Sequence, residues 1–239
     1  GGGHGHFDKL QLILYGLGQT LCPDPGTTGY GVALHGKWYK QTAAHNTVVI
    51  GTASQKATKA ELLSFQATGA EATAAAACTG AYEGFRLSRR IVLSGRTLVD
   101  VYTVEGDREE SIDWLLRAPG ELTLSLPTSA LQQEAPNPTY AYFEAQQVSA
   151  TDGDWTATWE VDDKGGRLLV TMQAAPGTQV ISALAPGIPG QRPWHTLRVR
   201  RQGSHTAFRA VYQMLKPGET PQPVEWTAGG VQVGERLVA

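Results

Sequence analysis

Three side chains near the start of the sequence are of types that bind metal ions. His6, Asp24 and His45 offer two imidazoles and one carboxylate, and both groups are common zinc ligands. Three protein ligands leave a fourth coordination position for water or a substrate. The spacing puts the three side chains on separate elements, unlike the compact ligand pairs of a zinc knuckle. Residue type and spacing alone make a metal site one interpretation among several.

The segment that carries His6 predicts a strand. Between His6 and Tyr15, leucines alternate with other apolar residues, which is typical of an extended chain that is apolar on both faces. Residues two apart in a strand share a face. We therefore expect His4, His6 and Asp8 to project together. For His4, which follows three glycines, a flexible chain end is the competing interpretation.

Other polar residues lie in turn-forming stretches near these histidines. Tyr30 is flanked by glycines, a context in which an aromatic ring can also cover the edge of a core. Asp24 lies between two prolines, as in an ordinary turn. Asn46 follows His45, and we expect it to orient that ring by a hydrogen bond, because metal-bound imidazoles have such partners.

The large aromatic residues have two interpretations. Trp38, Tyr39 and Trp194 have rings that can stack on sugars, but packing in the core is the favoured prediction for each. The remaining histidines fit no ligand pattern and are predicted to be structural or exposed: His35, His195 and His205.

The spacing of short apolar runs predicts an all-β fold. The runs are separated by turn signals among 28 Gly and 13 Pro, and no alternation with helices is seen. We expect a large antiparallel β-sandwich of two sheets, similar to a jelly roll. In Lys56–Ala77, Ala, Glu and Lys favour a helix, but Gly69 and several Thr favour two strands, which is our prediction. The other expected strands are 47–52, 85–93, 98–104, 122–126, 155–161, 168–172, 179–184, 196–200, 206–214 and 230–238.

Pro and Gly cluster near the C-terminus. The stretch 217–223 predicts a β-sandwich domain over residues 1–215, followed by C-terminal strands at 216–239 that can belong to the same domain. The chain opens on Gly1 rather than Met, so we expect an excised fragment of a longer protein.

The net charge and the hydropathy of the sequence argue against nucleic-acid and membrane partners. The formal net charge is −2, so nucleic-acid binding is not predicted. The basic run Arg198, Arg200 and Arg201 is expected on a solvated strand face. No apolar run is long enough for a membrane span, and no membrane partner is predicted. Cys22 and Cys78 are expected to be buried free thiols.

Several motifs between His4 and Gln55 match a known family in order and register. They are His-Gly-His-Phe-Asp-Lys-Leu at His4–Leu10, then Asp24, Gly-Tyr-Gly around Tyr30, and Thr-Ala-Ala-His-Asn-Thr-Val-Val at Thr42–Val49 followed by Gln55. Together they resemble the heparinase II/III-type lyases and the related alginate lyases. The resemblance implies a polysaccharide lyase that cleaves uronate-containing glycans, either glycosaminoglycan or alginate-like, by β-elimination.

The resemblance also implies roles for individual residues. Tyr30 and His4 match positions that face the substrate, Tyr30 as base or acid and His4 in proton transfer or charge stabilisation. His6, Asp24 and His45 match ligands of a zinc ion, to which we assign a mainly structural role because metal binding and folding are often coupled.

The family architecture sets further expectations. Such enzymes have an N-terminal α/α toroid before their β-sheet domains, with the active site at the junction, so this chain is expected to lack the toroid and to be inactive alone. The resemblance also implies a periplasmic or extracellular bacterial protein. The alternatives are a non-catalytic carbohydrate-binding or structural β-module, with Trp38 and Trp194 on an open face, and a metal-dependent hydrolase, for which no compact motif is found.

Overall fold

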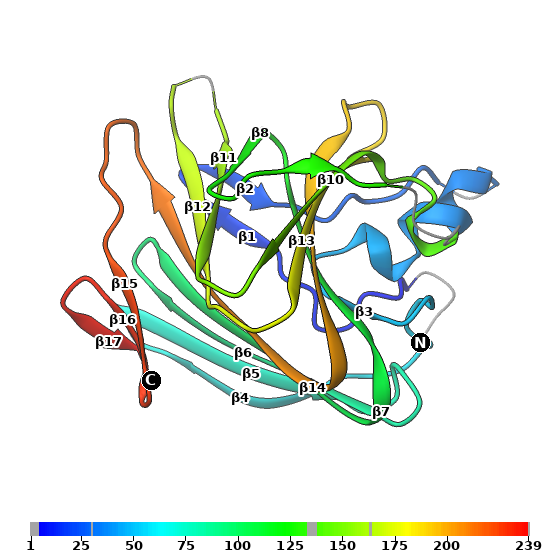
Figure 1. The fold of residues 1–239 in the computed structure, drawn as a ribbon, viewed down its shortest axis with the longest axis horizontal. Coiled ribbons are helices and arrows are strands. Elements are labelled where there is room, and N and C mark those ends of the chain that lie inside the picture. The colour runs from blue at the N-terminus through cyan, green and yellow to red at the C-terminus, as the bar shows by residue number, and fades with distance from the viewer. Residues whose placement is uncertain (1–4, 30, 133–137, 163, 239) are drawn as a thin grey trace.

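A computed structural model describes residues 5–29, 31–132, 138–162 and 164–238, which form two antiparallel layers of strands (Figure 1). Three short helical turns, η1 (His35–Tyr39), η2 (Thr42–Ala44) and η3 (Pro138–Tyr140), lie at one end. The described part of the chain contains no helix of the length and apolarity that a membrane crossing needs. The shorter strands are β1 (Leu14–Gly16), β2 (Gln19–Cys22), β3 (Val48–Ile50), β4 (Glu61–Ala67), β5 (Glu71–Cys78), β6 (Phe85–Ser94), β8 (Glu121–Leu124), β9 (Ser129–Ala130), β10 (Glu144–Thr151), β11 (Trp155–Glu160), β12 (Arg167–Met172), β13 (Thr178–Ala185), β15 (Val224–Thr227), β16 (Gly230–Val233) and β17 (Arg236–Val238).

Two long strands, β7 (Thr97–Ala118) and β14 (Trp194–Leu215), belong to both layers. They pair with each other along most of their length, with a register shift between Gly203 and His205. On one side of this register shift, the strands of the first layer are hydrogen-bonded in the order β4-β5-β6-β7-β14-β12-β11-β8. On the other side β3 pairs with β7, β13 pairs with β14, and β10 and β9 follow. Figure 1 shows both long strands running from one layer into the other.

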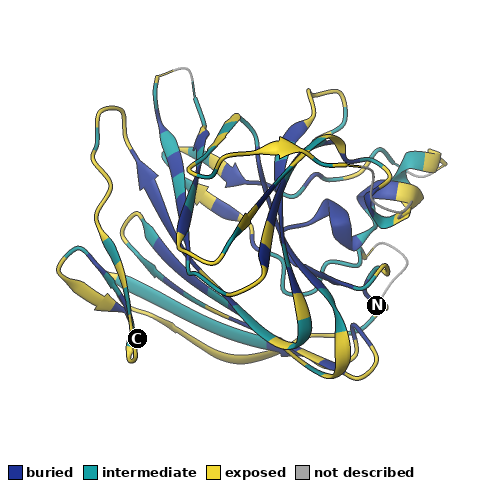
Figure 2. Ribbon diagram, in the orientation of Figure 1, coloured by how far each residue is buried: buried dark blue, intermediate teal, exposed yellow. Residues whose placement is uncertain are grey.

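The main core fills the space between the layers. Along β11 the residues Trp155, Ala157 and Trp159 are buried and alternate with more exposed ones, as expected for a strand with one face on a core. Trp114 and Phe208 stack there with ring centroids 6.4 Å apart. Each such aromatic ring removes about 150–250 Å² from water. Figure 2 shows buried residues along the central strands and exposed residues mainly in the loops and outer strands.

Most predictions of the fold are confirmed. The chain is an all-β antiparallel sandwich, and Lys56–Ala77 forms the two strands β4 and β5 rather than a helix. Cys22 and Cys78 are free and buried. The aromatic residues for which we favoured packing are all buried: Trp38, Tyr39 and Trp194.

Two predictions of local structure are wrong. The segment His6–Tyr15 is a strand only from Leu14, because Leu10 has a positive φ of 60° and the backbone before β1 bonds to loops instead of a sheet. The basic run on β14 is not a solvated face, since Arg198 and Arg201 are buried. Arg200 donates two hydrogen bonds, of 2.7 and 2.8 Å, to the carboxylate of Asp113.

The last three strands form a separate small sheet, β15-β16-β17. Val231, Val233 and Val238 pack with Val92 of β6 and Val211 of β14 on the outer side of the large sheet. The C-terminal strands are therefore attached to the sandwich by a hydrophobic cluster of their own, while a domain boundary at residues 215/216 stays a prediction.

Candidate metal centre

Four side chains capable of binding a metal converge at the end of the sandwich that carries η1 and η2. His6 and Asp8 come from the loop before β1, Asp24 follows β2, and His45 follows η2. One ligand atom from each of the four lies within 4.8 Å of every other. The structure therefore brings together the three predicted ligands His6, Asp24 and His45, and adds Asp8.

The ring of His45 is fully buried and held at both nitrogens. Its Nε2 lies 3.0 Å from the carbonyl oxygen of Tyr39, and a carbonyl only accepts, so Nε2 carries a hydrogen. Its Nδ1 lies 3.0 Å from Oδ2 of Asp24. In a neutral ring with its hydrogen on Nε2, Nδ1 carries a lone pair that faces the Asp24 carboxylate. Two such acceptors repel each other unless a proton or a metal cation lies next to both.

The carboxylate of Asp24 is ionised. Burial opposes ionisation, but the contact with His45 and the hydrogen bonds from the Gln11 side chain at 3.0 Å and the Gly26 amide at 2.7 Å outweigh it, so the pKa of Asp24 lies well below its usual range. The Pro-Asp-Pro-Gly turn provides the amide, because Gly26 adopts a φ of +73°. Asp24 is thus a negative oxygen ligand at neutral pH.

His6 is favoured in its neutral form. Burial, together with the neighbouring His45 and His35, lowers the pKa of His6, while Asp24 and Asp8 act in the opposite direction. The ring centroids of His6 and His45 are 5.2 Å apart. Neutral imidazole is the form that binds metals, so the donor set of two imidazoles and one or two carboxylates fits a zinc-type cation.

The Thr42–Gln55 segment holds the His6 loop by side-chain hydrogen bonds to its backbone. Thr42 Oγ1 donates to the Phe7 carbonyl at 2.6 Å, and Thr47 Oγ1 donates to the Lys9 carbonyl at 2.7 Å. Gln55 accepts from the Lys9 amide at 2.6 Å and donates to the Lys9 carbonyl at 3.2 Å. These polar residues replace the strand pairing that the loop lacks, which satisfies its backbone groups.

The predicted hydrogen bond from Asn46 to the His45 ring is wrong. The Asn46 amide donates to the Leu12 carbonyl at 3.0 Å, and its oxygen accepts from the backbone amide of Arg117 at 2.8 Å. The Tyr39 carbonyl orients the ring of His45 instead. Asn46 joins the loop before β1 to strand β7, so it supports the site through the backbone.

A buried ion pair beneath the site was not predicted. Arg89 on β6 donates to both oxygens of Asp100 on β7, at 2.8 and 2.6 Å. Its Nη1 donates to the carbonyls of Leu10 and Asn46, at 2.7 and 2.8 Å. One guanidinium therefore ties together the two loops that carry the candidate ligands. The alternation of Phe85, Leu87 and Arg89 on the buried face of β6 is the signal that could have identified it.

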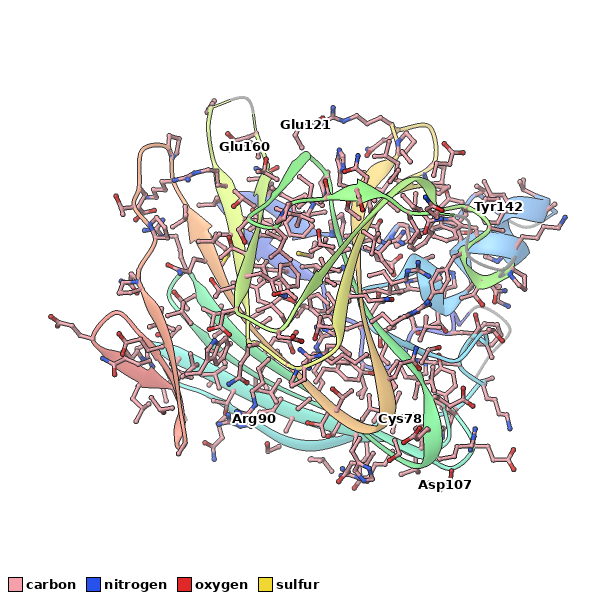
Figure 3. All side chains as sticks on the ribbon, in the orientation of Figure 1. Cys78, Arg90, Asp107, Glu121, Tyr142 and Glu160 are labelled. Atoms are coloured by element: carbon pink, nitrogen blue, oxygen red, sulfur yellow. The ribbon has the colours of Figure 1, made fainter. Side chains whose placement is uncertain are left out.

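A second buried cation, Arg117 on β7, supports η2. Its Nη2 donates to the Ala43 carbonyl at 2.6 Å, and its guanidinium lies 4.9 Å from the Trp38 ring centroid. Burial lowers the pKa of Arg117 to about 9, and the charge of Asp24 partly opposes this change. The guanidinium is therefore protonated at neutral pH and offsets part of the negative charge at the site. Tyr142, labelled in Figure 3, packs on the same Trp38 with ring centroids 5.6 Å apart.

Residues 1–184 match the family described as heparinase II/III-like, C-terminal. This match covers more than half of the chain. The chain belongs to that family. The heparinase II/III-like domain is 32% identical to an exo-oligoalginate lyase of Saccharophagus degradans and 30% identical to an alginate lyase of Stenotrophomonas maltophilia. Each alignment covers 51% of this chain and 20% of the relative, so the chain spans about a fifth of their length.

Solved structures show the same fold. A heparan sulfate lyase of Pedobacter heparinus superimposes with a TM-score of 0.75 at 13% identity, covering 100% of this chain and 37% of that one. A heparinase III superimposes with a TM-score of 0.69 at 14% identity, covering 96% of this chain and 35% of that one. At these identities the similarity shows the fold alone. In both solved structures, the matching region is about a third of a longer chain.

Two residues that we predicted to face substrate in this heparinase II/III-like domain, His4 and Tyr30, lie outside the described residues. His35, predicted to be structural or exposed, adjoins the candidate ligands instead. Its ring centroid lies 5.8 Å from that of His6, and its Nδ1 lies 2.7 Å from Thr27 Oγ1. Sequence reasoning missed it because η1, which turns His35 back toward the site, has no distinctive sequence pattern.

Proposed function

We propose that this chain is the β-sandwich part of a polysaccharide lyase that cleaves uronate-containing acidic glycans by β-elimination. The observation that carries the proposal is the convergence of His6, Asp24 and His45 from three separate elements in a chain of this family. The names of the relatives, all lyases of alginate or heparan-type glycans, support it.

β-Elimination needs several positioned groups. A base removes the proton beside the uronate carboxylate, charge builds on that carboxylate, and an acid protonates the departing glycosidic oxygen. Within the proposal, Tyr30 acts as base or acid and His4 transfers a proton or stabilises charge. The remaining groups come from an N-terminal α/α toroid, which the proposal makes a partner of this domain, and the isolated chain is inactive.

A zinc ion is the proposed cofactor, held by His6, Asp24 and His45. When bound, it supplies a positive charge that fixes these ligands and thereby the loops around them. The chain's own residues prepare this arrangement: the Tyr39 carbonyl sets the His45 tautomer, and hydrogen bonds keep Asp24 ionised. The metal is proposed to be mainly structural.

The substrate class favoured by the relatives is alginate. The two relatives at 30–32% identity are both named alginate or oligoalginate lyases, whereas the heparan sulfate lyase is 13% identical. The proposal includes a periplasmic or extracellular location in a bacterium, which the family resemblance implies. A non-catalytic sugar-binding module is less well supported, because Trp38 and Trp194 are buried rather than on an open face.

The activity test measures unsaturated uronate by its ultraviolet absorbance, with alginate and heparan sulfate as separate substrates. It uses this chain and, where the gene encodes further residues, the full-length product. We expect product from alginate with the full-length protein, and loss of product in Tyr30→Phe. The proposal fails if no acidic polysaccharide yields unsaturated product with the full-length protein.

The metal test measures zinc per chain by mass spectrometry after purification and dialysis. We expect one zinc per chain, and loss of that zinc in His45→Ala. His195→Ala is the matched control, since His195 lies at the start of β14 and outside the group of candidate ligands, with 3.3 Å between His195 Nε2 and the carboxylate of Glu121. Glu121 is labelled in Figure 3. Equal zinc in both variants contradicts the proposed centre.

A further inference from the structure

Asp8 has the position of a metal ligand rather than of a surface carboxylate. It lies in the same group as His6, Asp24 and His45, with one oxygen within 4.8 Å of a ligand atom of each. Its side chain is 21% exposed, less than the 26% of Asp24. Asp8 is therefore buried at least as far as Asp24.

The side chain of Gln11 brings the two carboxylates to one place. Its Nε2 donates to Asp8 Oδ2 and to Asp24 Oδ2, at 3.0 Å in both cases. Two carboxylates that share one amide nitrogen repel each other. Lys9 Nζ lies 3.0 Å from the other oxygen of Asp8 and supplies one positive charge. The two carboxylates and the one ammonium leave an excess of negative charge, which a divalent cation offsets.

We propose that Asp8 is the fourth protein ligand of the metal, so that the centre is closed with two nitrogen and two oxygen donors. This inference rests on the proposed metal at His6, Asp24 and His45. A zinc site with four protein ligands has no open position for water or substrate, which is the mark of a structural site. The ion then fixes the loops before β1 and around His45, and takes no direct part in the chemistry.

The observed spacing fits this coordination after a small contraction. With bonds of about 2.0–2.1 Å, a tetrahedral zinc holds its ligand atoms about 3.3 Å apart. The ligand atoms lie within 4.8 Å of one another, so binding one ion moves each of them inward by at most about an ångström. Asp8 lies in a loop before β1 rather than in a strand, and rotation of its short side chain provides that movement.

The deciding experiment replaces zinc with cobalt(II) in the purified protein and in Asp8→Ala and Asp8→Asn. Four-coordinate cobalt absorbs visible light more strongly than five- or six-coordinate cobalt. We expect the intense spectrum in the wild type, a weaker spectrum in Asp8→Ala, and a fall in zinc affinity larger than the about 10–100-fold typical of outer-shell partners. Asp8→Asn keeps the shape and is the variant to use if Asp8→Ala fails to fold, as judged by circular dichroism.

Lys9→Met is the matched control, because it removes the ammonium that contacts Asp8 and leaves the carboxylate in place. It should retain the cobalt spectrum of the wild type. An unchanged spectrum and an affinity within twofold in both folded Asp8 variants overturn the assignment of Asp8, while the metal centre itself stands. A wild type that binds no stoichiometric zinc overturns the proposed centre, and the role of Asp8 with it.

Discussion

Strand β7 carries two buried aspartates, Asp100 and Asp113, and each is paired with an arginine of a neighbouring strand. Asp100 accepts two hydrogen bonds from Arg89 on β6, and Asp113 accepts two from Arg200 on β14. Both carboxylates are almost fully inaccessible to water. The two pairs have the same chemistry and lie in opposite halves of one strand.

The pairs differ in what else they hold. Arg89 also donates to the carbonyls of Leu10 and Asn46, in the loops that carry the candidate metal ligands. Asp113 instead accepts a hydrogen bond from the hydroxyl of Tyr140 in η3, in the second layer. One pair therefore supports the site and the other supports the scaffold, so the same kind of ion pair should have different effects on metal binding.

The largest expected effect is that of Asp100→Asn. It leaves the buried guanidinium of Arg89 without its anion, a change that costs about 3–5 kcal/mol in comparable buried pairs. It also loosens the ties to the two ligand loops, so we expect zinc affinity to fall by about 10-fold or more. Urea unfolding measures the first effect and calorimetric titration the second. A folded variant with wild-type zinc affinity would show that Arg89 does not position the ligands.

Asp113→Asn is the counterpart in the scaffold. The free energy of unfolding should fall by a similar amount, about 3–5 kcal/mol, because a buried pair is again broken. Zinc affinity, measured below the unfolding transition by the same titration, should stay at the wild-type value. A marked loss of zinc affinity would mean that the Asp113–Arg200 pair also supports the site, and the contrast between the pairs would disappear.

Asn46→Ala should lower both stability and zinc affinity, each by less than Asp100→Asn does. It orphans the Leu12 carbonyl and the backbone amide of Arg117, both of which are hydrogen-bonded to Asn46 in the wild type. An unsatisfied buried group costs about 1–3 kcal/mol, and the His6 loop loses one tie to β7. We expect lower stability by urea unfolding together with a smaller loss of zinc affinity than in Asp100→Asn. If the affinity loss is equal or larger, Asn46 rather than Arg89 is the main support of the site.

The smallest effect is expected for Thr47→Val, which keeps the shape but removes the hydrogen bond to the Lys9 carbonyl and the weaker contact with the Tyr102 hydroxyl at 3.2 Å. A single hydrogen bond contributes about 0.5–1.5 kcal/mol, and thermal unfolding is the measurement. Thr128→Val is the control, since its hydroxyl bonds to Gln147 at an exposed position. Equal changes in both variants would argue that the bond from Thr47 has no special role in holding the loop.

The sequence predicts the parts of this molecule that depend on local pattern. Alternation of buried and exposed residues identifies β6 and β11. Residue type makes His6, Asp24 and His45 candidate metal ligands, and the family resemblance selects them from the other interpretations. It does not predict that β7 and β14 continue across both layers, because the bend falls at polar residues that look like a turn. The sequence pattern of β7 around Glu105–Glu110 is that of a loop, although it is strand throughout.

The loop before β1 shows why pattern fails at the site. Its alternating leucines are typical of a strand, yet its backbone bonds to Thr42, Thr47 and Gln55 from distant parts of the sequence. Such tertiary hydrogen bonds override local propensity. The role of Arg89 is hidden for the same reason, since its partners Leu10 and Asn46 are far away along the chain.

The continuity of β7 and β14 through both layers has a consequence for how the protein opens. Each layer takes hydrogen bonds from the same two strands, so neither layer can separate from the other while those strands remain intact. We expect local opening at elements on the periphery of the sandwich, such as the edge strand β4 and the small C-terminal sheet. The loops of the candidate metal centre are bonded to β6 and β7, so we expect the centre to stay closed during such local opening.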